Sequence, residues 1–509
     1  MPVSFNHIPD NLRLRLYWAE MDPSKAGTFV NNRRILILGH GTGAANDNAL
    51  YRFGSAASVR TLTGRGSMLD RMIVKLRGAN GFDDAWFIDV PEPTAGVKAT
   101  GSIEVTAGAS VAGTLFLYIG GQRLQIGIVA GDDETDVATK IAAAINAAPD
   151  LPVTAVVVDD EDDDTVALTC RWKGVTGNDI DIRVNYLGAL GTETLPTSLA
   201  LSITPMAGGT GVPDLEDAFA ALGDQDFETI VHAWTDSGAL NAFDTEWGHG
   251  DDGRWGWQRM LYGHVWSARN GTFGELSSFG DVRNGGEQST WGLYGSPTPP
   301  WERAAVLGGV VHRALMEDPA RPLGTLPLPG VLAPVEADRF TKAEKNALLF
   351  DGITVADENP DGSMQIQQVI THYQRNPYGL DDNALLKVNT KATYAYVMRS
   401  QRLRIVQRFP RHKIANDGTR FGPGQAITTP SGIKGEIYAH YREMEWIGLL
   451  ENAEQAMRNT IVERDVDNPD RVNVLYAPDF VNQLDVFAVI SQFRLQYAPD
   501  LGQQSVPVI

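Results

Sequence analysis

The sequence predicts a multidomain chain of mixed α/β and α+β class, in which a β-rich domain interrupts the first α/β domain. Its 509 residues exceed what one hydrophobic core accommodates, so about three domains are expected. Buried-strand patterns alternate with amphipathic helical patterns before residue 94 and again after residue 211. Between them, short alternating strands bounded by Gly, Asp and Pro predict a separate β-rich unit.

The α/β domain is expected to comprise residues 27–94 and 211–338, after an N-terminal extended arm, 1–26. The segment Arg34–Leu38, which is apolar after its first residue, predicts a buried strand. A helix with one apolar face is predicted around Ser67–Leu76. The other expected elements are strands at Trp86–Val90, Thr229–Trp234 and Leu261–Trp266, and helices at Asp214–Leu222, Leu240–Trp247 and Trp301–Leu315.

The inserted domain is expected to span residues 95–210. Because the chain returns to the same sheet, the two ends of the insertion should lie close together. Its acidic turns, 132–136 and 159–164, lack the spacing of an EF-hand, so neither a metal nor another cofactor is predicted. Strands are predicted at Gly113–Ile119, Arg123–Val129, Val153–Val158, Thr165–Cys170 and Asp179–Tyr186, and a helix at Thr135–Ala148.

Residues 339–485 form the expected C-terminal α+β domain. A hairpin is predicted from Ile353–Ala356 and Met364–Thr371, which flank a turn rich in Asn, Pro and Gly. A long helix is expected over Asp382–Arg408, and Thr429 is expected to cap a second helix that begins with proline.

Both ends of the chain have an extended pattern. Leucines alternate with arginines in the N-terminal arm, and apolar residues recur in the C-terminal strand and arm, 486–509. Such strands either fold back onto their own domain or pair with the sheet edge of another chain, and the second alternative predicts self-assembly. The candidate inter-subunit strand residues are Leu12, Leu14, Leu16, Val486, Val489, Phe493 and Leu495.

The charge is unevenly distributed. A formal net charge of −20 argues against a general binder of nucleic acid or anionic membranes, but residues 385–420 hold nine Lys/Arg against Asp417 alone. Most of these cations lie on the helix expected over Asp382–Arg408. They form either a solvated face or a surface that attracts an acidic partner, and that partner is nucleic acid or an acidic protein cylinder. The candidate residues of this basic helix are Lys387, Lys391, Arg399, Arg402, Arg404 and Arg408.

Other candidate sites have less support. His40, Ser67 and Asp236 lie in fragments similar to the motifs of subtilisin-type hydrolases, but their order along the chain is wrong for that family. The glycines after His40 fit a tight strand-to-helix turn better than a phosphate loop. Neither a membrane span nor a signal peptide is predicted, and the single cysteine, Cys170, excludes an internal disulfide. Four tryptophans are expected in the core or an interface: Trp247, Trp255, Trp257 and Trp266.

Several of these segments carry a resemblance to a known family. Val3–Pro9, Arg34–Gly39 and, most strongly, Gln368–Tyr497 resemble the contractile tail sheath proteins of bacteriophages, particularly the Mu-like branch. Asn376–Gly379 and Val474–Pro478 are similar to the C-terminal region of that family. The resemblance covers nearly the whole chain, and its specificity comes from the order of the segments.

The resemblance implies a structural protein rather than an enzyme. It implies a subtilisin-like α/β core without the catalytic triad, stacked hexameric rings around a tail tube, exchange of both arms between subunits, and contraction that drives the tube through the host envelope. The implied partners are other copies of the chain, the tail tube protein, and baseplate and tail terminator proteins, without membrane span or direct nucleic-acid contact. The implied location is the virion tail, after assembly in the host bacterial cytoplasm. A hydrolase with a subtilisin-like fold and a nucleic-acid-binding protein that uses residues 385–420 remain the alternatives.

Overall fold

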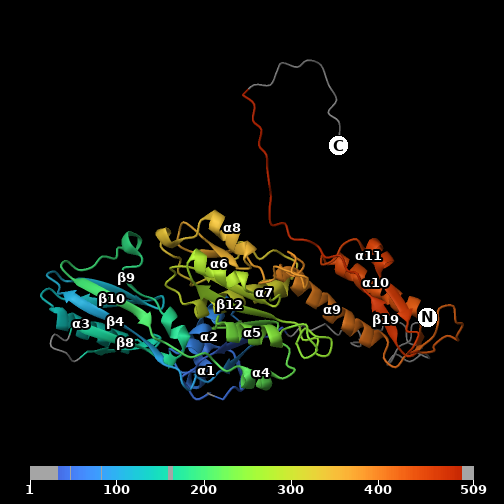
Figure 1. Ribbon diagram of the computed structural model, residues 1–509, viewed down its shortest axis with the longest axis horizontal. Helices are drawn as coiled ribbons and strands as arrows, with labels where there is room; N and C mark the ends of the chain where they lie inside the picture. The colour runs from blue at the N-terminus through green and yellow to red at the C-terminus, as the bar shows by residue number, and fades with distance from the viewer. Residues whose placement is uncertain (1–32, 46, 82, 159–163, 496–509) are drawn as a thin grey trace, which may run out of the picture.

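The computed structural model describes residues 33–45, 47–81, 83–158 and 164–495. The molecule is elongated (Figure 1), with the inserted β-rich region, residues 95–210, at one end and a six-stranded sheet with its helices in the middle. Helix α9 (Val388–Arg408) leads from this middle part to a small C-terminal unit at the other end. The chain is therefore a mixed α/β protein with several separate sheets, as the sequence predicts.

The central sheet has the strand order β13-β12-β11-β1-β3-β2, and only its edge strand β2 is antiparallel to its neighbour. Leu36 in β1 pairs with Ile230 on one side and Trp86 on the other. Every residue of β1 is buried, which is typical of a parallel sheet covered on both faces. The strands are β1 (Ile35–Gly39), β2 (Leu50–Phe53), β3 (Ala85–Asp89), β11 (Thr229–His232), β12 (His264–Asn270) and β13 (Gln288–Leu293).

Helix α7 (Pro300–Glu317) is the longest helix that packs on this sheet, and α2 packs beside it. A Cβ atom on Gly308 would lie 2.4 Å from Val231 Cγ2, so glycine allows the helix to approach the sheet closely. The other helices of this part are α1 (Ala56–Thr63), α2 (Met68–Ala79), α4 (Glu216–Leu222), α5 (Ser237–Glu246) and α6 (Phe273–Asp281).

The expected elements of the α/β part are present, but the sequence pattern does not predict β2, α1, α6 or β13. Strand β13 shows why, because its first three residues are polar although all of its residues are buried. Ser289 Oγ donates a hydrogen bond to Ile370 O at 2.6 Å, and Thr290 Oγ1 lies 2.8 Å from His372 Nε2. Polar partners from distant segments thus replace the apolar contacts that a sequence pattern would show.

The inserted region contains two antiparallel sheets, with strand orders β10-β4-β8-β7 and β6-β5-β9, and helix α3 contacts both. A bridge pairs Val97 with Thr210, so the ends of the insertion lie side by side, as expected. Strands β4 and β10 are additional to the predicted set. The elements are β4 (Lys98–Ala107), β5 (Gly113–Ile119), β6 (Gln122–Ile128), α3 (Glu134–Ala147), β7 (Val153–Val157), β8 (Thr165–Lys173), β9 (Ile182–Val184) and β10 (Ala200–Ala207).

The C-terminal part contains the predicted hairpin and both predicted helices. Helix α9 begins at Val388 rather than Asp382, because the preceding residues form a loop closed by a bridge between Ile370 and Lys387. Thr429 caps α10 by accepting a hydrogen bond from Gly432 N. The elements are α8 (Lys342–Phe350), β14 (Val355–Glu358), β15 (Met364–Gln368), α9, β16 (Lys413–Ile414), β17 (Ile427–Thr428), α10 (Pro430–Trp446), α11 (Ala453–Asn459), β18 (Ile461–Arg464) and β19 (Val472–Leu475).

Candidate functional site: assembly surfaces

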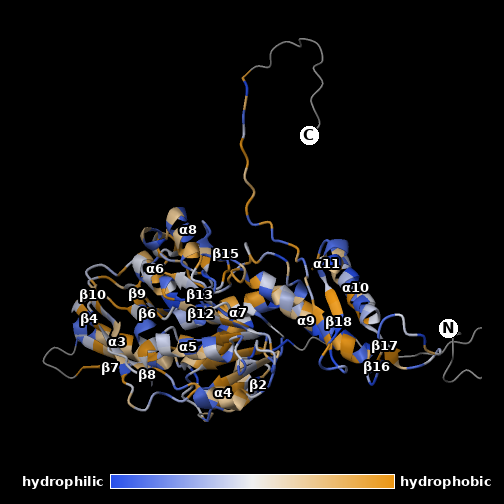
Figure 2. Ribbon diagram, turned by 45° about the vertical axis from the view of Figure 1, so that its right-hand side comes forward, coloured by the Kyte–Doolittle hydropathy of each residue, from blue (hydrophilic) through white to orange (hydrophobic). Residues whose placement is uncertain are grey.

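The C-terminal segment, residues 486–495, extends away from the rest of the molecule (Figure 1). It forms no strand in this single chain, because a strand requires a hydrogen-bonded neighbour. Apolar residues recur along it (Figure 2), and a run of exposed apolar side chains of this extent is typical of a surface that another chain covers. The four candidate strand residues are exposed as follows: Val486 80%, Val489 68%, Phe493 83% and Leu495 97%.

The chain just before this segment is anchored to the body. Val481 N donates a hydrogen bond to Leu449 O at 3.2 Å. Asp485 forms an ion pair with Lys387, and its Oδ2 accepts a hydrogen bond from Gln368 Nε2 at 3.4 Å. Lys387, which belongs to the predicted basic helix, therefore contacts the base of the C-terminal segment.

The first described residue lies beside α7 and α9. The described chain begins at Arg33, whose Nη1 donates a hydrogen bond to Leu315 O at the end of α7. The Arg33 guanidinium also lies 5.5 Å from the centre of the Tyr396 ring on α9. Three candidate strand residues of the N-terminal arm lie outside the described residues: Leu12, Leu14 and Leu16.

Strands β18 and β19 form a separate antiparallel ribbon in the C-terminal unit. Ile461 pairs with Leu475, and these two residues are 51% and 60% exposed. Within the described chain, neither outer edge of the ribbon pairs with a further strand. A two-stranded ribbon is marginally stable by itself, and its free backbone groups can accept another extended chain.

Two cations of α9 face the α/β core rather than the solvent. Lys391 is buried and forms an ion pair with Glu287. Arg399 pairs with Glu228, and its Nη2 lies 2.9 Å from Asp226 Oδ1. Burial lowers the pKa of Lys391. These two side chains hold α9 against the core. They are therefore not available to an acidic partner, which corrects their place among the candidate residues of the basic helix.

The second half of α9 is more exposed. Arg404 bridges to α10 through Glu436 and Glu443, with both N–O distances at 2.6 Å. Arg408 is exposed and lies 3.5 Å from Glu436. Arg402 is exposed, and no carboxylate of the described residues lies within ion-pair distance of it. Arg402 and Arg408 are therefore the candidate cations of α9 that remain on the surface.

His40, Ser67 and Asp236 do not form a catalytic arrangement. His40 Nδ1 lies 2.8 Å from Val90 O, and Ser67 Oγ donates to Thr63 O at 2.8 Å. Asp236 Oδ1 caps the N-terminus of α5. Within the described chain, no hydrogen bond joins any two of the three side chains, so each has a local structural role.

His40 and Gly41 follow β1 at the carboxyl end of the central sheet, where α/β proteins bind their ligands, and both are buried. Burial lowers the pKa of His40 to about 4, and its ring lies 5.1 Å from that of Trp234. A Cβ atom on Gly174 of the inserted region would lie 3.9 Å from His40 Nε2, so this glycine lies beside the buried ring. The adjacent turn is tight, because a Cβ atom on Gly41 would lie 2.1 Å from Asp89 Oδ2. Packing therefore explains the glycines without a bound phosphate.

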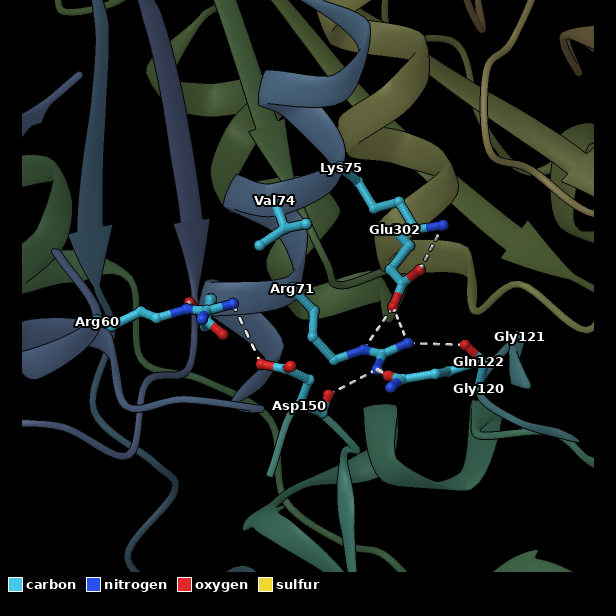
Figure 3. A pocket seen from close by; sticks show the side chains of 10 residues that line it. Arg60, Arg71, Val74, Lys75, Gly120, Gly121, Gln122, Asp150 and Glu302 are labelled. Carbon is cyan, nitrogen blue, oxygen red and sulfur yellow. Dashed lines mark hydrogen bonds and ion pairs between the residues drawn. The ribbon is translucent and has the colours of Figure 1, made fainter. Parts of the chain in front are cut away.

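Arg71 joins the inserted region to the α/β core (Figure 3). Its Nε lies 2.6 Å from Glu302 Oε1 on α7, and its Nη2 donates to Gly120 O at 2.7 Å. Its Nη1 donates to Asp150 O at 2.8 Å and to Gln122 Oε1 at 3.1 Å. A cavity of about 370 Å³ adjoins these residues. One guanidinium therefore satisfies acceptors from both parts of the molecule.

The amino-acid sequence gives little indication of this contact between the inserted region and the core. Charged residues directly before an apolar helical run are the one available signal, and Glu302 and Arg303 precede the apolar run 304–311 of α7. A fully buried carboxylate requires a cation as partner. The identity of that cation, Arg71, is not readable from the sequence, because the two residues lie far apart in the chain.

The four tryptophans behave differently from one another. Trp247 and Trp266 are buried in the core, as expected, and Trp255 is half-buried. Trp257 is 72% exposed, so it does not belong to the core, and its expected place in an interface stays a prediction. Trp255 and Trp257 line a cavity of about 480 Å³ together with Tyr394 of α9.

The described residues contain no group of three or more His, Cys, Asp or Glu that could hold a metal ion. Asp132 pairs with Lys140, and Asp133 caps α3. Cys170 is buried, and burial raises the pKa of its thiol to about 12. None of the described helices is both long enough and apolar enough to cross a bilayer.

Comparisons with known proteins show to which family the chain is similar. A family model described as the phage tail sheath C-terminal domain matches residues 381–494, and one described as the phage tail sheath protein beta-sandwich domain matches residues 94–210. The class is thus that of phage tail sheath proteins. A Mu-like prophage FluMu tail sheath protein of Haemophilus influenzae is 38% identical over 499 residues, which cover 97% of this chain and 100% of the relative.

The chain belongs to the phage tail sheath family, in its Mu-like branch. It is a structural protein of a contractile tail and not an enzyme. Among solved structures, the sheath tail protein from Desulfitobacterium hafniense is 14% identical, with a TM-score of 0.47 and coverage of 92% of this chain and 97% of that chain. The helical sheath of the anti-feeding prophage in its contracted state is 11% identical, with a TM-score of 0.46 and coverage of 95% and 99%.

Proposed function

We propose that copies of this chain polymerise as stacked hexameric rings around a tail tube, and that both terminal arms complete sheets of neighbouring copies. The observation that carries the proposal is the C-terminal segment, whose apolar side chains are exposed although the chain before it is anchored. Apolar surface of this extent is stable in water when another chain covers it. In a homopolymer, a neighbouring copy supplies this cover.

The β18–β19 ribbon is the proposed acceptor for the arms. One added strand of five or six residues forms about four to six backbone hydrogen bonds, each contributing a net ~0.5–1.5 kcal/mol. Exposed Ile461 and Leu475 supply apolar surface beside the free edges. Because several such strands link each copy to its neighbours, they act multivalently and keep the lattice connected.

Contraction is proposed to be a downhill rearrangement from a metastable extended lattice to a more tightly packed one. Contacts between the globular parts exchange while the arms remain bound, and no nucleotide is required. This movement drives the tube through the host envelope. Arg402 and Arg408 are the residues of α9 that we assign to the side facing an acidic tube, since Lys391 and Arg399 are used internally.

We assign the parts of the chain as follows: 27–94 with 211–338 as a subtilisin-like core without a catalytic triad, 95–210 as the outer domain, 339–485 as the sheath domain, and 1–26 and 486–509 as arms. The separate sheets and the bridge between Val97 and Thr210 support this division. The proposed partners are other copies, the tail tube protein, and baseplate and tail terminator proteins. Assembly is proposed to occur in the host bacterial cytoplasm, before the sheath is part of the virion tail.

Deletion of residues 486–509 tests the arm role. The truncated chain should keep its fold, because the hydrophobic cores are built from residues before 486, but it should form no sheath-like tubes in negative-stain microscopy. A full-length variant with Phe487→Ser and Phe493→Ser should show the same defect without a change in length. Intact tubes from the truncated chain would contradict the proposal.

A further inference from the structure

The C-terminal segment leaves the body at Asp485. We propose that the ion pair between Asp485 and Lys387 is a salt-sensitive clip that sets the direction in which this segment leaves. The inference rests on the proposed function, because it concerns how the same arm is presented to a neighbouring copy. It adds a residue pair that regulates this presentation.

The contacts along the chain place the clip at the end of an anchored stretch, directly before residues 486–493. Val481 N bonds to Leu449 O, and Gln483 Nε2 donates to Ala320 O at 3.3 Å. Asp485 is the last residue of this anchored stretch. Within the described chain, no hydrogen bond or ion pair holds residues 486–493 to the body, and their apolar side chains are largely exposed. A change at Asp485 therefore acts directly on residues 486–493.

Two separate elements hold the Asp485 carboxylate. Lys387 immediately precedes α9 and pairs with Ile370 in a β-bridge, so its backbone is fixed on both sides. Gln368 ends β15, and its Nε2 lies 3.4 Å from Asp485 Oδ2. A single contact would leave rotation about the contact free, whereas contacts from two elements restrict the direction of the chain.

The clip is weak enough to be exchanged during assembly. The side chains of Lys387 and Asp485 are 33% and 23% exposed, so solvent and salt screen their attraction. A pair of this kind shifts the population of clipped segments by about two- to fivefold. In a lattice whose copies change state together, a twofold preference for the clipped state in each of about ten copies changes the equilibrium between the two lattice states about a thousandfold. A weak contact in each copy can therefore decide the state of the polymer.

Spin-label distance measurements on the soluble full-length chain test the proposal. Cysteines introduced at Phe487, two residues beyond Asp485, and at exposed Gln455 on α11 can be labelled selectively, because Cys170 is buried. The clipped chain should show a narrow distance distribution at low salt. Asp485→Asn should broaden this distribution and lower the clipped population about two- to fivefold. The charge exchange Lys387→Asp with Asp485→Lys should restore it.

Salt and a matched ion pair provide the controls. In ~1 M salt the Debye length is about 3 Å, so the distance distribution of the unsubstituted chain should become as broad as that of Asp485→Asn. The distribution of Asp485→Asn should itself change little with salt. Arg442→Gln removes another exposed pair, with Glu445 on α10, and should leave the distribution unchanged. An unchanged distribution in Asp485→Asn, or no recovery in the charge-exchanged variant, overturns the clip. Both outcomes are independent of tube formation, so they are distinguishable from a failure of the arm deletion.

Discussion

Lys391 Nζ lies 4.4 Å from the centre of the Trp255 ring. Lys391 belongs to α9 and Trp255 to the loop after α5, so the contact joins the C-terminal helix to the α/β core. Lys391 also pairs with Glu287. Burial by itself would raise the pKa of Glu287, but Lys391 and His249 outweigh it and lower this pKa to about 2. The buried lysine is therefore an internal structural group.

We expect Lys391→Met to destabilise the fold. It leaves the Glu287 carboxylate buried without its cation, which should lower the free energy of unfolding by about 3–5 kcal/mol. Urea unfolding followed by tryptophan fluorescence measures the change. The double variant Lys391→Met with Glu287→Leu removes both charges and should recover much of the loss. Equal losses in the single and double variants would contradict the buried-pair explanation.

Arg71→Ala should loosen the joint between the inserted region and the core. The variant leaves Glu302 with Lys75 as its one cation, at 3.3 Å, and removes the donors to Gly120 O and Asp150 O, so a loss of about 3 kcal/mol is expected. Hydrogen exchange should increase around residues 118–122 and 148–152. Arg65→Ala is the matched control, because Arg65 also binds Asp150 but is 48% exposed. Its effect should stay below about 1 kcal/mol.

Reversal of the exposed cations of α9 should affect binding rather than folding. Arg402→Glu with Arg408→Glu should change the free energy of unfolding by only about 0.5 kcal/mol, because both side chains are exposed. The variant should co-assemble less well with the purified tube protein, most clearly at low salt. Arg399→Glu should instead unfold more easily, since it places a carboxylate beside Asp226 and Glu228. Unchanged co-assembly of the double variant at low salt would argue against electrostatic docking.

Acidification should destabilise the chain through its buried histidines. Burial lowers the pKa of His232 and of His372 to about 3, and it also lowers that of His264. Between pH ~6.5 and the folded pKa, the unfolded chain binds protons that the folded chain does not. The free energy of unfolding should therefore fall by up to ~1.4 kcal/mol per pH unit for each histidine. Asp89 opposes this, because burial raises its pKa to about 8 and the folded chain keeps that proton.

The contribution of one histidine can be isolated. His372→Gln retains a donor toward Thr290 but does not titrate. Its unfolding free energy, measured in urea at pH 7, 6 and 5, should depend on pH less steeply by about 1.4 kcal/mol per unit. Parallel curves for the variant and the unsubstituted chain would show that His372 does not contribute.

Local chemistry made much of the fold predictable. Thr341 and Glu344 form a capping box at the start of α8, and Thr429 caps α10, because such caps depend only on neighbouring residues. The continuous apolar pattern of β1 likewise identifies a buried strand. Strand β13 escapes prediction, since its polar side chains are satisfied by partners such as Ile370 and His372 from a distant segment.

The sequence by itself determined the amphipathic segments, the resemblance to tail sheath proteins and the apolar character of the C-terminal arm, because these depend on the order of residues along the chain. Only the tertiary structure decided which cations of α9 are available to a partner. Lys391 and Arg399 are neutralised by Glu287 and Glu228, whereas Arg402 remains exposed. The position of a residue in a helix sets the direction of its side chain around the helix axis. The acidic residues that pair with Lys391 and Arg399, however, come from segments far away in the chain, so the sequence pattern does not reveal them.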